Sequence, residues 1–110
     1  MIRRLFLAWA GLLAFAGPAA SAELPEFTLT LESHRFVPDE LTVPAGQKFR
    51  LVVENRDATA EEFESYDLHR EKIVPGNGRI TVYVGPLKPG RYEFFGEFNP
   101  ATARGFLVAE

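Results

Sequence analysis

Alternating apolar and polar residues dominate the chain from residue 27 onward and leave few folds open to it. Phe27, Leu29 and Leu31 are separated by polar residues, and the segments 49–54 and 80–84 repeat the same two-residue period. This period is typical of strands with one buried face. No window shows a sustained 3.6-residue period. The sequence therefore predicts an all-β protein without helices.

Short turn signals separate the alternating segments. Pro44-Ala45-Gly46, residues 75–78 and Lys88-Pro89-Gly90 can each supply the fixed or positive φ that a tight turn requires. Further short strands are expected at 40–43, 62–68, 71–74, from Tyr92 onward, and at 106–109. About eight strands at regular spacing predict a Greek-key antiparallel β-sandwich. Most of the phenylalanines are expected to fill its core.

The first 22 residues have the organisation of a secretory signal peptide. Arg3 and Arg4 precede an uninterrupted apolar run from Leu5 to Gly17, and Ala20-Ser21-Ala22 resembles a cleavage site. The run is shorter than the roughly 20 residues of a membrane-spanning helix. We therefore expect a signal peptide at 1–22, one domain at 23–110, export to the periplasm, and no membrane insertion after cleavage.

Charge and cysteine content exclude several classes of function. Twelve Lys and Arg against 15 Asp and Glu give a net charge of −3, so nucleic acid is not an expected partner. The absence of cysteine excludes disulfides, thiolate zinc sites and iron–sulfur clusters. Neither Ser33 nor Ser65 lies in a Gly-x-Ser-x-Gly motif. The sequence therefore predicts no catalytic residues of a hydrolase.

Several segments resemble cupredoxins. Residues 36–46 with the strand to Asn55 are similar to the first half of that family, and residues 87–96 resemble its last hairpin, which carries copper ligands at its exit. Three shorter motifs, at 61–65, 70–76 and 102–105, resemble the EfeO-type cupredoxin-like domains of periplasmic iron-uptake systems. The resemblance implies a cupredoxin-like sandwich. It also implies partnership with periplasmic and membrane components of an iron-uptake system.

The copper ligands of that family are missing from the corresponding positions. A blue-copper site needs two His, one Cys and usually an axial Met. By the resemblance, the first His position falls at Glu61 or Glu62, the Cys position at Gly96, the second His position at Asn99, and the Met position near Ala103 or Arg104. Without a thiolate, we expect no type 1 copper and no blue-copper electron transfer.

The same pole of the expected sandwich is rich in carboxylates. If Phe63 points into the core, Glu61 shares its face while Glu62 and Glu64 point the other way, although a β-bulge would exchange Glu61 and Glu62. Oxygen donors with an occasional imidazole suit Fe(II), Fe(III), Mn(II) or tetragonal Cu(II). An iron or copper ion is thus the expected cofactor, and oxygen ligands would favour Fe(III) and assist oxidation of Fe(II). The candidate ligands are Glu61, Glu62, Glu64, His69, Glu71, Glu97 and Asn99.

A metal-free interpretation is also open. Arg70, Lys72 and Arg104 could neutralise the acidic residues in surface ion pairs, which contribute little to stability. The domain would then be an interaction module that docks to a transport or envelope complex. Its contact patch would be Phe98-Asn99-Pro100 with Phe95. His34, at a strand end, is expected to be exposed or locally hydrogen-bonded rather than to bind a metal.

Overall fold

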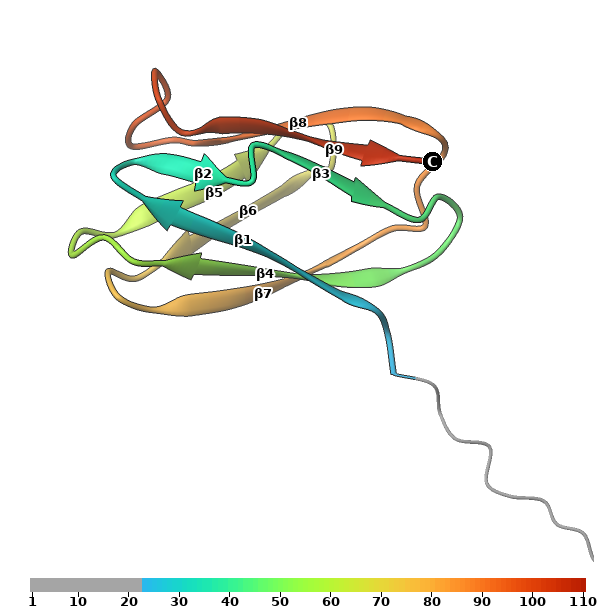
Figure 1. Cartoon of the computed structure of the whole chain (residues 1–110), viewed down its shortest axis with the longest axis horizontal. Coiled ribbons are helices and arrows are strands. Elements are labelled where there is room, and N and C mark those ends of the chain that lie inside the picture. Colours follow the sequence, from blue (N-terminus) through green and yellow to red (C-terminus); the bar gives the residue numbers. More distant parts are fainter. Residues whose placement is uncertain (1–22) are drawn as a thin grey trace, which may run out of the picture.

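The computed structural model describes residues 23–110, which form two β-sheets packed face to face (Figure 1). The signal peptide expected at 1–22 lies outside the described residues. No helix long and apolar enough to cross a membrane occurs within 23–110. The strands are β1 (Glu26–Glu32), β2 (Arg35–Val37), β3 (Glu40–Val43), β4 (Phe49–Asn55), β5 (Glu61–Ser65), β6 (Arg70–Val74), β7 (Arg79–Val84), β8 (Gly90–Gly96) and β9 (Arg104–Ala109).

The strand order makes both sheets mixed. One sheet has the order β2-β1-β4-β7 and the other β3-β9-β8-β5-β6. β1 runs parallel to β4 and β3 runs parallel to β9, whereas the remaining neighbours are antiparallel. The predicted all-β sandwich is confirmed, but its purely antiparallel pairing is wrong. Both parallel pairs join strands far apart in the sequence, and alternation within a strand does not reveal its partner.

Strand β2 was not predicted from the sequence, because its three residues are too few to show a period. β2 pairs with β1 across a turn in which Ser33 and His34 have φ of 55° and 57°. The Asp57 carboxylate fixes this turn by accepting hydrogen bonds from the backbone N–H of Ser33 (2.7 Å) and of His34 (2.9 Å). The His34 ring is exposed, with Nδ1 3.6 Å from the same carboxylate. His34 therefore lies in a local contact, as expected.

Aromatic rings from both sheets fill the core. The ring centroid of Phe36 lies 5.0 Å from that of Phe94 and 6.2 Å from that of Phe63, both in edge-to-face contact. All three side chains are buried, and a third edge-to-face pair joins Phe27 and Phe49. Such pairs stabilise a core beyond the area they bury. This packing fixes the inward face of β5, because Phe63 lies at its centre.

Candidate functional site

The alternation along β5 divides the candidate ligands between two sides of the five-stranded sheet. Glu61 and Phe63 are buried on the inner side, whereas Glu62 and Glu64 are half-buried and project from the outer side. The pairing of β5 with β6 is continuous from Glu61 to Ser65, so no bulge exchanges Glu61 and Glu62. The structure therefore contains two acidic groups to consider, an inner one and an outer one.

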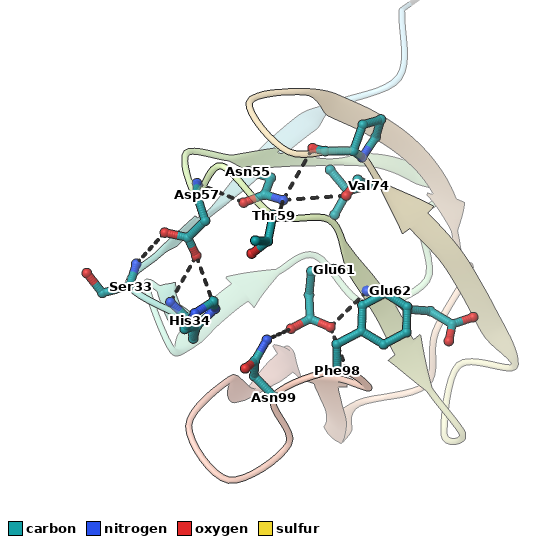
Figure 2. Close-up of polar contacts among 11 residues, drawn as sticks. Ser33, His34, Asn55, Asp57, Thr59, Glu61, Glu62, Val74, Phe98 and Asn99 are labelled. Atoms are coloured by element: carbon teal, nitrogen blue, oxygen red, sulfur yellow. Dashed lines mark hydrogen bonds and ion pairs between the residues drawn. The ribbon is translucent and has the colours of Figure 1, made fainter.

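Glu61 is the centre of the inner group. Its side chain is 3% exposed, and its Oε1 accepts hydrogen bonds from the backbone N–H of Glu62 (2.8 Å) and of Phe98 (2.7 Å). Its Oε2 accepts a third bond from Nδ2 of Asn99 at 2.9 Å, as Figure 2 shows. Buried carboxylates need such donors, because an unpaired charge is costly to remove from water. Glu61 and Asn99 are therefore brought together, but they form a hydrogen bond with each other instead of offering two free ligands to a metal ion.

The residues at the expected copper-ligand positions converge in space. A Cβ added to Gly96 would lie 2.6 Å from Cδ of Glu61 and 2.9 Å from Cβ of Ala103. The space beside Gly96 is thus filled by the Glu61 carboxylate. A type 1 copper ion does not fit these residues, because no thiolate or imidazole is present among them and the carboxylate already accepts three hydrogen bonds.

The outer acidic cluster consists of Glu62, Glu64 and Glu71. Each can offer one carboxylate oxygen such that these oxygens lie within 4.8 Å of one another. Glu64 lies directly opposite Glu71 in the β5–β6 pair, an arrangement in which like charges repel. Three carboxylates at this spacing can coordinate one cation.

The electrostatics of the outer cluster favour binding of protons or other cations. Partial burial, followed by repulsion from Glu71, Glu97 and Glu61, raises the pKa of Glu62 above its ordinary value. Partial burial, followed by repulsion from Glu71, Glu62 and Glu97, raises the pKa of Glu64 in the same way. Both shifts have the sign expected for carboxylates crowded together without a neutralising partner.

The basic residues expected to neutralise the acids are engaged elsewhere. Arg70 donates from Nε to the carbonyl of Tyr83 (2.9 Å), and Lys72 donates to the carbonyl of Thr81 (3.1 Å), both on β7. Arg104 pairs with Glu93 at 3.0 Å. Within residues 23–110, no ion pair involves Glu62, Glu64 or Glu71. The surface-ion-pair interpretation of these acids is therefore wrong, and sequence spacing gave no sign that Arg70 and Lys72 reach the other sheet.

His69 and Glu97 lie at the margin of the outer cluster. His69 lines an open depression of about 370 Å³ together with Glu64 and Glu71. Its φ of 56° in the β5–β6 turn was not foreseen from the sequence. Glu97 acts on the pKa of both Glu62 and Glu64, yet it is not among the residues whose oxygens converge within 4.8 Å. The structure thus brings three of the seven candidate ligands into the outer cluster, with His69 beside Glu64 and Glu71, and it places Glu61 and Asn99 in the separate inner group.

Comparison with known proteins gives a consistent result. A family model described as a cupredoxin-like domain matches residues 5–109. An uncharacterized protein of Rickettsia prowazekii (strain Madrid E) is 51% identical over 83 residues, which cover 76% of this chain and 66% of that protein, just under two thirds of its length.

Solved structures of copper proteins share the fold at low sequence identity. Auracyanin A of Chloroflexus aurantiacus, described as a blue copper protein, is similar with a TM-score of 0.66 and 17% identity, covering 77% of this chain and 98% of that one. Amicyanin of Paracoccus versutus gives a TM-score of 0.60 and 16% identity, covering 84% and 85%. The all-β sandwich is therefore the fold of those proteins.

Proposed function

This chain belongs to the cupredoxin-like domain family, and we propose that it is a metal-handling member that binds iron or copper through carboxylates on the outer side of β5 and β6. The observation that carries the proposal is the convergence of Glu62, Glu64 and Glu71, each of which offers a carboxylate oxygen within 4.8 Å of the others. Within residues 23–110, no basic side chain forms an ion pair with any of the three. Partial burial and then mutual repulsion raise the pKa of Glu62 and Glu64, and a bound cation would offset both by neutralising the carboxylates.

The donor set favours a hard ion as cargo. All three side chains offer oxygen, which suits Fe(II), Fe(III) and Mn(II), while His69 at the margin could add the imidazole that Cu(II) accepts. Oxygen ligands stabilise Fe(III) more than Fe(II), so the site would lower the reduction potential of bound iron and hold Fe(III) more tightly than Fe(II). The chain has no cysteine and therefore no type 1 copper site.

We further propose that the protein serves periplasmic iron uptake. The support is the resemblance of residues 61–65 and 70–76 to EfeO-type domains, because these two motifs contain all three carboxylates of the outer cluster. The signal-like segment 1–22 supports export to the periplasm. The corresponding partners would be the periplasmic and membrane components of the same uptake system.

Equilibrium binding of Fe(II), measured without oxygen, and of Cu(II) tests the metal site. We expect one ion per chain in the wild type, and a loss of affinity of at least about tenfold in the triple variant Glu62→Gln, Glu64→Gln, Glu71→Gln. A matched triple variant, Glu32→Gln, Asp39→Asn, Glu110→Gln, removes as many charges from exposed positions and should bind like the wild type. Equal losses in both triple variants would mean that only the overall charge matters, and the site would be rejected.

The interaction-module alternative is favoured by a separate observation, the presence of exposed aromatic side chains beyond each end of β5. Phe98 is 51% exposed and Tyr66 is 69% exposed. Phe95, in contrast, lies beneath the Tyr66 ring, with centroids 5.4 Å apart, and beneath Arg104. The exposed ring of the expected contact patch would therefore be Phe98 rather than Phe95. Absence of metal binding in the wild type would favour this alternative.

A further inference from the structure

We infer that the Glu61 carboxylate takes the structural place of a metal ion at the copper pole of this fold. The copper pole is the end of the sandwich, beside Gly96 and Asn99, where the resemblance to cupredoxins places the copper ligands. It ties β5 to the loop between β8 and β9, and it keeps that pole closed to copper. The inference concerns different atoms from the outer cluster of Glu62, Glu64 and Glu71. If the inference about Glu61 is wrong, the proposed metal binding at the outer cluster is unaffected. If the outer cluster binds no metal, the inference about Glu61 is unaffected.

The connection between β5 and the loop depends on Glu61. The pairing of β5 with β8 ends at Phe63 and Gly96. Beyond it, the backbone N–H of Glu97 donates to the carbonyl of Glu62 at 2.9 Å. The following contacts to β5 are made by the Glu61 carboxylate, which accepts from Phe98 N–H and Asn99 Nδ2. Hydrogen bonds to an ionised acceptor are stronger than neutral ones, so this side chain is a strong tie.

The loop is already shaped to present its donors to Glu61. The N–H groups of Asn99 and Gly96 donate to the carbonyls of Gly96 (3.1 Å) and Ala103 (2.8 Å), and the N–H groups of Thr102 and Ala103 both donate to the carbonyl of Asn99. These bonds close the turn upon itself. The Glu61 carboxylate then fixes the closed turn against the sandwich, as a metal ion fixes ligands from separate segments.

The same geometry excludes a copper ion from the pole. A carboxylate has about four lone-pair positions, and three are occupied by N–H donors here. The group is 3% exposed, and it fills the space beside Gly96 that a ligand side chain would use. A metal ion could enter only by displacing the bonds that hold the loop. The pole is therefore complete without metal.

Amide hydrogen exchange in the EDTA-treated protein tests the inference. We expect the Phe98 amide to be protected without any metal, and Glu61→Gln to speed its exchange by about tenfold or more, since the charged acceptor is lost. Glu97→Gln is the matched control, because Glu97 lies in the same loop, loses the same charge and is exposed. Its effect on the Phe98 amide should be less than about twofold. Equal exchange rates in Glu61→Gln and the wild type would overturn the inference.

Two further measurements cover the case in which Glu61→Gln does not fold. Asn99→Ala removes one donor to Glu61 and keeps the backbone bonds of the turn, so it should speed exchange of the Phe98 amide by a smaller factor. In the triple variant Glu62→Gln, Glu64→Gln, Glu71→Gln, which lacks the outer carboxylates, diamagnetic Cu(I) added without oxygen should leave the amide shifts of Phe98 and Asn99 unchanged. Slower exchange or shifted amides on Cu(I) addition would show that the pole binds copper, and would refute the inference.

Discussion

Cδ of Glu61 lies 2.6 Å from the point where a Cβ of residue 96 would stand. Gly96 does not have the positive φ that favours glycine elsewhere in the chain, at Gly46 for example. The glycine is therefore required by space rather than by backbone conformation. Residues 61 and 96 form one structural unit: the carboxylate can be buried only because its neighbour has no side chain.

The first prediction concerns this pair. Gly96→Ala should lower the free energy of unfolding by about 1–3 kcal/mol, because the added methyl group overpacks against Glu61 and Ala103. In a Glu61→Ala background the same substitution should cost less, giving a coupling energy of about 1 kcal/mol in a double-mutant cycle. Urea unfolding of the four proteins measures it. Strictly additive effects would show that the two residues are independent.

The second prediction concerns repulsion in the outer cluster. The pKa of Glu64 is raised in the folded protein, so the carboxyl is charged more easily in the unfolded chain. The destabilisation comes from partial burial and then from repulsion by the neighbouring carboxylates. It is absent at a pH below the unfolded pKa, where both states are protonated, and it is complete once the pH has risen through the folded pKa. Glu64→Gln should therefore raise the thermal midpoint at neutral pH and have a smaller effect in acid. Glu32→Gln, at an exposed position, should change neither midpoint. A lower midpoint of Glu64→Gln at neutral pH would contradict the assignment.

Strand parity was the part of this site that sequence could predict. With Phe63 inward, alternation predicts Glu61 inward and Glu62 and Glu64 outward unless a bulge exchanges Glu61 and Glu62. The structure has Phe63 and Glu61 buried, and the pairing of β5 with β6 is continuous, so the alternative without a bulge is confirmed. What sequence could not give was the set of partners. The donors to Glu61 come from residues 98 and 99, and Arg70 and Lys72 reach β7 in the other sheet. Contacts of this kind join residues far apart in the sequence, so they depend on the order of strands in the two sheets. Alternation within a strand does not reveal that order, and two of the strand pairs are parallel.

The third prediction concerns stabilisation by metal. A cation that binds only the folded protein should raise its free energy of unfolding by about 2.7 kcal/mol at a concentration of 100 times Kd. The thermal midpoint should rise with Fe(II) or Mn(II) at neutral pH. The rise should fade as the pH falls through the raised pKa of Glu62 and Glu64, because protons compete for the same oxygens. In the Glu62, Glu64 and Glu71 triple Gln variant, added metal should not change the thermal midpoint. A rise in this variant as large as in the wild type would exclude the cluster as the site.

The fourth prediction concerns colour. Intense blue absorption by a cupredoxin requires a copper–thiolate bond, and this chain contains no cysteine. The protein with Cu(II) should therefore show only weak visible absorption, even if the ion binds at the outer cluster. An absorption spectrum at one equivalent of Cu(II), compared with free Cu(II) in the same buffer, measures this. An intense visible band would mean that the ligand assignment is wrong.

The fifth prediction concerns Asn55, a buried residue that aligns the two strands of the outer cluster. Its Nδ2 donates to the carbonyls of Thr59 (2.8 Å) and Pro75 (3.2 Å), which flank β5 and β6, and its Oδ1 accepts from Asp57 N–H (Figure 2). Asn55→Ala should lower the free energy of unfolding by about 1–3 kcal/mol, because buried partners lose their hydrogen bonds.

A second effect of Asn55→Ala should appear in metal binding. Since Asn55 connects the start of β5 to the end of β6, its loss should weaken the alignment of Glu64 with Glu71 and lower metal affinity without removing a ligand. Thr59→Ala is the control: Thr59 is exposed and contacts Asn55 through its carbonyl alone, so stability should change by less than about 0.5 kcal/mol. Urea unfolding and Fe(II) titration of both variants separate the two effects. Full stability in Asn55→Ala would show that these bonds do not hold the strands in register.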